Sequence, residues 1–179
     1  MSAPQVVWSS VEPIGAVRLA PTAEPVEMEF ACEVVQVEGA VVDESTQAVF
    51  VDGSLVAVDL TWLHPREHVL AEPVVPTAYV ERGLLAPLGN AVNEFYALME
   101  TCAGLQVLDR AALLAGAWLV GHPREHSASV LKEALALYGC TFRPGSGDHQ
   151  FVRVGTLYVP RFWVRPAGSG EEHFDAPRW

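Results

Sequence analysis

The dipeptide Asp52-Gly53 constrains the fold of this chain more than any other feature, because it separates two short runs with alternating apolar residues. Both residues tolerate the positive φ angles that a two-residue β-hairpin requires. Residues 47–51 and 54–60 are therefore predicted to form two paired antiparallel strands.

A third strand is predicted immediately upstream, where apolar residues alternate with glutamates. The apolar set is Met28, Phe30, Cys32 and Val34, and the acidic set is Glu27, Glu29 and Glu33. We therefore expect an antiparallel β meander over residues 26–63, with Phe30 and Phe50 buried. The glutamates are expected to be exposed and to form an acidic face.

The length of 179 residues suffices for a buried core, and half of the residues are hydrophobic. The longest apolar run, Ala111–Val120, is too short to span a bilayer, and the first residues lack the pattern of a secretory signal. Three widely spaced cysteines indicate free thiols in a reducing compartment. We expect a cytoplasmic protein without a membrane segment. Because no cofactor-binding motif is present, we expect no cofactor.

The helical period begins after the prolines at 73 and 76. An apolar stripe over 88–102 predicts one helix that ends near Gly104, and the apolar run 110–120 predicts a second helix. Ser127 and Gly139 are typical caps of a third. Strands are then predicted at 141–143, 150–154 and 156–159, with a tight reversal at Gly155.

The fold class predicted from these elements is α+β: an acidic antiparallel β meander, then a three-helix, winged-helix-like unit with a C-terminal β-hairpin. Four parts of the chain follow: an N-terminal arm (1–25), a β subdomain (26–72), a helical subdomain (77–166) and a tail (167–179).

Residues 107–166 resemble the winged-helix modules of phage replication and primase-type proteins. The resemblance rests on a leucine–glycine helix end, an arginine-bearing hairpin and an aromatic-Arg-Pro close. The matching residues are Leu135-Ala136-Leu137-Tyr138-Gly139, Arg143, Arg153 and Trp163-Val164-Arg165-Pro166. The resemblance implies contact with nucleic acid. Few basic residues lie on the third helix, so contact with the phosphate backbone is favoured over base reading.

Charge is distributed unevenly, although the net charge is −11. Residues 1–105 sum to −12, whereas residues 106–165 sum to +3. Aromatic residues alternate with the arginines of this basic segment, and aromatic rings can stack on bases. We therefore expect nucleic acid to bind residues 140–165. The candidate contacts are Lys132, Arg143, Arg153, Arg161 and Arg165. The alternative is that the aromatics face the core and the arginines face solvent.

A second resemblance concerns the same segment, which is similar to small HicA-type mRNA interferases. It rests on Gly139, Arg143, Gly145-Ser146, His149, Phe151 and Val159-Pro160. It implies that His149 is a catalytic acid or base in RNA cleavage. The chain departs from that pattern, because two residues separate Ser146 from His149 and no helix follows Pro160.

The pentapeptide HPREH occurs twice, and each copy places two histidines four residues apart. Histidines at this spacing share a helix face, as in some metal sites. The candidate ligands would be His64, His68, His122 and His126. Structural zinc usually recruits cysteine as well, so two surface turns without metal are the favoured interpretation.

Three functional hypotheses follow. The first is a small non-enzymatic DNA-associated protein, of replication or transcription, that contacts nucleic acid through the basic hairpin. The second is an acidic protein-interaction or inhibitor module, in which the face formed by residues 26–60 binds a basic protein or imitates DNA. The third is a HicA-like ribonuclease.

Overall fold

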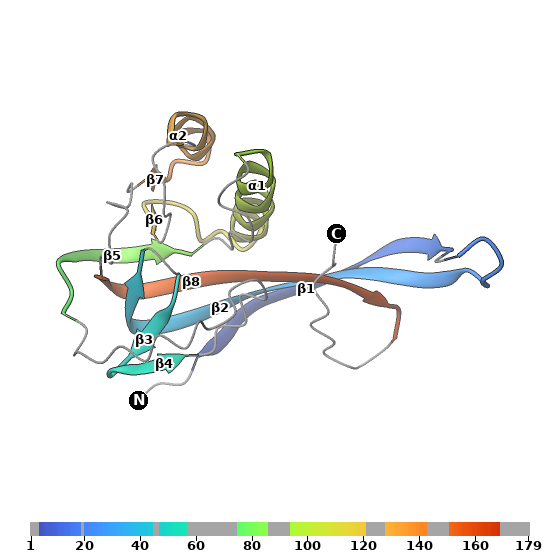
Figure 1. Cartoon of the computed structure of the whole chain (residues 1–179), viewed down its shortest axis with the longest axis horizontal. Coiled ribbons are helices and arrows are strands. Elements are labelled where there is room, and N and C mark those ends of the chain that lie inside the picture. The colour runs from blue at the N-terminus through green and yellow to red at the C-terminus, as the bar shows by residue number, and fades with distance from the viewer. Residues whose placement is uncertain are drawn as a thin grey trace.

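The computed structural model describes residues 4–18, 20–44, 47–56, 75–85, 94–120, 128–142 and 151–168. Within these ranges the chain forms one mixed sheet of eight strands, with two helices over one of its faces (Figure 1). The strand order is β4-β3-β2-β8-β5-β6-β7, and β1 pairs with β2 outside this path.

The sheet is built on two long antiparallel strands, β2 (Val26–Asp43) and β8 (Phe151–Pro166). β1 (Gln5–Val17) pairs with the first half of β2 and completes a three-stranded ribbon. Figure 1 shows that the β1–β2 hairpin continues past the end of β8 and projects from the body. The N-terminal arm expected from the sequence therefore contains an edge strand.

The predicted hairpin at residues 52–53 is confirmed. β3 (Val49–Val51) and β4 (Ser54–Val56) pair antiparallel, and Asp52 and Gly53 have φ angles of 50° and 77°. β3 also pairs with β2, which gives the expected meander over the described part of residues 26–63. Phe50 is buried as expected, and Phe30 is half-buried.

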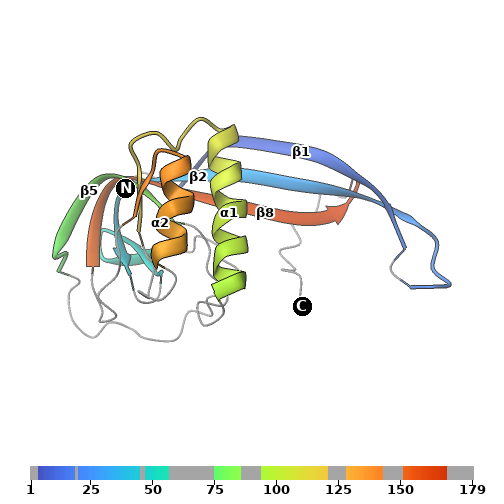
Figure 2. The same cartoon turned by 90° about the horizontal axis from the view of Figure 1, so that it is seen from above.

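The described residues between 78 and 142 add three parallel strands and two helices. β5 (Ala78–Leu84) pairs with β8, and β6 (Trp118–Leu119) and β7 (Thr141–Phe142) follow in the sheet. The connections contain α1 (Glu94–Arg110) and α2 (Ala128–Leu137), which lie side by side over the same face of the sheet (Figures 1 and 2). Neither helix is long and apolar enough to cross a membrane.

The predicted winged-helix-like unit is wrong. Residues 110–120 do not form a helix: Ala112 and Gly116 take positive φ angles, and the chain then enters β6. A short run that is apolar on all sides fits a buried parallel strand as well as a buried helix, and here the strand is observed. The first helix also runs past Gly104 to Arg110. The described part of residues 77–166 thus has two helices and three parallel strands in place of a three-helix unit.

The predicted wing hairpin is wrong as well. β8 runs through Gly155 without reversing, and the short β7 pairs with β6 rather than with β8. The β2–β8 register on either side places Gly155 opposite Gly39, which has a φ of 65°. The alternation of side chains on β2 reverses at Gly39. Val37, two residues before Gly39, and Ala40, one residue after it, point into the same core. Glycine at 155 thus accompanies a twist of the ribbon rather than a turn.

Both faces of the sheet are buried near its centre. One core lies under the helices and includes Cys32, Val34, Leu105, Leu108 and Leu135. The other core, on the opposite face, includes Val35, Val42, Val152, Leu157 and Val159. Adjacent residues of β2 therefore belong to different cores, as expected for a central strand.

The C-terminal cap of α2 follows from sequence as expected, whereas Ser127, the expected N-terminal cap, lies outside the described residues. Gly139 has a φ of 68°, and its N–H donates to the carbonyl of Ala136. The N–H of Cys140 donates to the carbonyl of Leu135, which completes a Schellman motif, and both residues are buried in the core under the helices.

Candidate protein-interaction site

The arginines predicted to contact phosphate have partners within the sheet. Arg161 forms an ion pair with Glu33, and Arg165 forms one with Glu29. Each pair lies directly across the β2–β8 register, and all four side chains are partly buried. Cross-strand pairs of opposite charge stabilise a sheet and neutralise both groups. These two arginines therefore carry little free positive charge.

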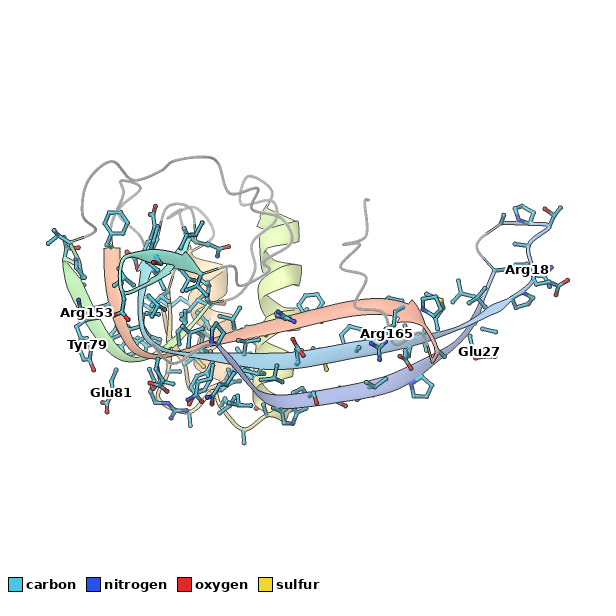
Figure 3. The ribbon with its side chains drawn as sticks, turned by 90° about the horizontal axis from the view of Figure 1, so that it is seen from below. Arg18, Glu27, Tyr79, Glu81, Arg153 and Arg165 are labelled. Atoms are coloured by element: carbon cyan, nitrogen blue, oxygen red, sulfur yellow. The ribbon has the colours of Figure 1, made fainter. Side chains whose placement is uncertain are left out.

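Two of the described basic candidates, Arg153 and Arg165, lie at opposite ends of β8. Arg153 is exposed at the other end of β8, twelve residues from Arg165. At about 3.3 Å per residue this separation is roughly 40 Å. Figure 3 shows Arg153 beside Tyr79 and Glu81, far from Arg165. Lys132 is exposed on α2, and Arg143 lies outside the described residues.

The acidic face expected over residues 26–60 is only partly formed. Glu27 is exposed as predicted, whereas Glu29 and Glu33 are half-buried in their ion pairs. Their burial differs from the prediction because β8, which carries the two arginines, covers that edge of β2.

The other candidate residues lie outside the part of the chain that the structure describes. They are His149, of the ribonuclease hypothesis, and His64, His68, His122 and His126, of the metal hypothesis. Among the described residues, no group of three histidine, cysteine or acidic side chains could hold a metal ion.

The cysteines are free thiols, as the sequence indicated. Cys32 and Cys140 are buried in the core under the helices, and Cys102 is half-buried. Burial is the main cause that raises the pKa of the Cys32 and Cys140 thiols. The thiol is therefore the stable form at neutral pH, which makes these cysteines poor nucleophiles.

β1 is the most apolar exposed element of the described chain. Eleven large hydrophobic residues are exposed over the whole described part of the chain, and five of them lie on β1. The five are Val6, Val7, Val11, Ile14 and Val17. The other six are distributed over six different segments of the chain. Scattered apolar residues are normal on a surface, whereas a concentration of them indicates an interaction site.

The outer edge of β1 also has main-chain groups that no described strand pairs with. Among the described strands, β1 pairs only with β2. Ser10 lies opposite Cys32, and its carbonyl oxygen accepts from the Cys32 thiol, so the main-chain groups of Ser10 point toward β2. Because these directions alternate along a strand, those of Ser9, Val11 and Pro13 point outward. Proline suits an outward position, because it has no N–H to give to the ladder.

Two side-chain contacts join β1 to the body. Trp8 is half-buried and packs on the core under the helices. Glu12 forms an ion pair with Arg110 at the end of α1, with 2.5 Å between the carboxylate oxygen and the guanidinium nitrogen. The open edge is thus presented by an anchored strand rather than by a loose terminus.

Sequence reasoning missed this edge because β1 has no clear period. The β1–β2 register shifts at Val7 and at Ile14, and each shift reverses the alternation of side chains. Between these irregularities, Trp8–Pro13 is too short to reveal a strand by alternation alone. The available signal was the richness of residues 5–17 in valine and isoleucine.

Comparison with known proteins supplies no relative: no family model, no curated protein and no solved structure matches the chain.

Proposed function

We propose that this is a non-enzymatic protein-interaction module whose edge strand β1 accepts an extended strand from a protein partner. The observation that carries the proposal is the coincidence, on β1, of an open main-chain edge and five exposed aliphatic side chains. Addition of a strand to an exposed sheet edge is a common mode of protein recognition, in which the main chain supplies affinity.

Two bulges and one proline interrupt the edge, but charge does not protect it against pairing. Exposed edge strands commonly carry lysine or inward-pointing charges that prevent association. β1 carries one charged residue, Glu12, and Arg110 neutralises it. Between the bulges, the segment Trp8–Pro13 is regular, so a partner strand has a continuous stretch to pair with.

Nucleic-acid contact is the second candidate. It is supported by the exposure of Arg153 and Lys132, and by the positive sum of charges over residues 106–165. The ion pairs of Arg161 and Arg165 count against it, because phosphate contact would require the arginines to leave their glutamates.

Binding of a synthetic strand tests the first proposal. The probe is a fluorescein-labelled peptide that copies residues 4–18, titrated with the full chain and followed by fluorescence anisotropy. The control peptide is methylated on the amide nitrogens of its Ser9 and Val11, which removes the donors that a sheet edge requires. We expect saturable binding of the first peptide and at least tenfold weaker binding of the second.

Two variants of the protein locate the binding site. Val11→Lys places a charge on the β1 edge, whereas Leu55→Lys places one on β4, at an equally exposed position (52% and 54%). Loss of peptide binding in the first variant alone supports the proposal. Equal affinity for both peptides, or equal binding by both variants, would overturn it.

A further inference from the structure

We infer that the partner strand comes from a second copy of this chain, so that two β1 strands pair antiparallel about a two-fold axis beside Val11. The inference rests on the proposed function, since it names the partner of the same edge.

The main chain of β1 is self-complementary in this arrangement. The Val11 N–H of each copy donates to the Val11 carbonyl of the other. The Ser9 N–H of each copy donates to the Pro13 carbonyl of the other. These four hydrogen bonds use both outward donors of the regular segment, and Pro13 is needed only as an acceptor.

The side chains that meet are compatible as well. The two Val11 side chains, each about half exposed in the single chain, lie next to each other on the face away from the helices. On the helix face, Ser10 of one copy lies opposite Glu12 of the other, and its hydroxyl can donate to that carboxylate. The pairing therefore puts no like charges opposite each other.

The register is restricted by symmetry. A two-fold axis at a sheet edge keeps each side chain on its own face, so the axis passes beside a residue and not between two residues. The bulges at Val7 and Ile14 confine regular pairing to Trp8–Pro13, whose middle residues are Ser10 and Val11. An axis at Ser10 places Trp8 opposite Glu12, whereas an axis at Val11 joins the two exposed valines.

Charge sets the salt dependence of the association. Each copy carries a net charge of −11, so two copies repel each other at low ionic strength. Salt screens this repulsion, and the apolar and main-chain contacts at the edge lose little by it. Dimerisation is therefore expected to strengthen as salt rises. A protein–phosphate contact has the opposite dependence.

Sedimentation equilibrium of the full chain tests the inference. We expect a monomer–dimer equilibrium whose dissociation constant falls as salt rises from about 0.05 to 0.5 M, which shortens the Debye length from roughly 14 to 4 Å. Val11→Lys is expected to raise the dissociation constant at least tenfold, and Leu55→Lys to leave it within twofold. A monomer at all concentrations and salts, or equal effects of both variants, would overturn the inference.

Cross-linking tests the register independently of those variants. Val11→Cys, treated with a short bis-maleimide, is expected to give a covalent dimer, and Leu55→Cys at the same concentration is not. More efficient cross-linking through Ser10→Cys than through Val11→Cys would overturn the Val11-centred pairing.

If the labelled peptide binds but the chain stays monomeric, only the second copy fails as partner. If neither associates, the proposed function fails too.

Discussion

Replacement of Gly155 by alanine is expected to destabilise the protein, because β5 leaves no room for a side chain there. A Cβ atom on Gly155 would lie 2.7 Å from the carbonyl oxygen of Glu81 and 3.0 Å from the hydroxyl of Tyr79. The register pairs Val80 with Val154 and Arg82 with Thr156, so this carbonyl belongs to the strand directly alongside. Main chain cannot rotate away, and β5 would have to move by several tenths of an ångström.

The magnitude follows from two opposing effects. Insertion of a methyl group into a closely packed site costs about 1–3 kcal/mol. The loss of chain entropy in the unfolded state offsets about 0.4–1 kcal/mol of this cost. We expect Gly155→Ala to lower the free energy of unfolding by about 1–2 kcal/mol, and the midpoint of thermal unfolding by roughly 2–8 °C.

Thermal unfolding followed by circular dichroism measures this effect. The double variant Gly155→Ala/Tyr79→Phe removes the hydroxyl contact but keeps the closer contact with the carbonyl of Glu81. The double variant should therefore be no more stable than the single variant Gly155→Ala. An unchanged or raised midpoint in the single variant would refute the close approach of β5 to β8. Full recovery in the double variant would assign the cost to Tyr79 instead.

Three further predictions concern other parts of the molecule. Ala112→Gly should raise the free energy of unfolding, measured by urea denaturation, by about 0.5–1 kcal/mol. The reason is that Ala112 has a φ of 56° at the exposed end of α1. Burial raises the pKa of Cys32 and Cys140 in the folded chain, so their contribution to stability is complete below the unfolded pKa. It is lost as pH rises through the folded pKa. The free energy of unfolding should therefore fall above about pH 8.5, and less steeply in the variant Cys32→Ala/Cys140→Ala. In gel shifts with duplex DNA and with RNA at low salt, Arg153→Ala combined with Lys132→Ala should abolish any retention that the parent shows. Retention that survives this change would place the contact elsewhere.

The β meander could be predicted from sequence because its signals are local. The pair Asp52-Gly53 fixes a two-residue turn, and the alternation from Met28 to Val34 gives one strand a buried face. The end of α2 at Gly139 was likewise predictable, since one glycine at positive φ completes the cap.

The parallel part of the sheet could not be predicted in the same way. Strands β6 and β7 have two residues each. β6 pairs with β5, which lies more than thirty residues earlier in the chain, and β7 pairs with β6. Glycine at 155 was predicted to be a turn, but here it accommodates the close approach of a neighbouring strand. Both uses of glycine give the same local sequence, and only tertiary contacts distinguish them.

The candidate site was also beyond local reasoning. The sequence shows four arginines in one segment, but not the glutamates of β2 that lie opposite two of them. The open edge of β1 is defined by the absence of a neighbouring strand among the described residues, which is a property of the sheet order. Local periodicity carries no information about either.

Amide hydrogen exchange of β1, followed by NMR in a dilute monomeric sample, tests the central claim most directly. We predict slow exchange for Ser10 and Glu12, whose N–H groups point toward β2, and fast exchange for Ser9 and Val11 at the open edge. Saturation with the peptide that copies residues 4–18 should slow the exchange of Ser9 and Val11 alone. Slow exchange of all four amides before the peptide is added, or unchanged exchange after it, would contradict the account.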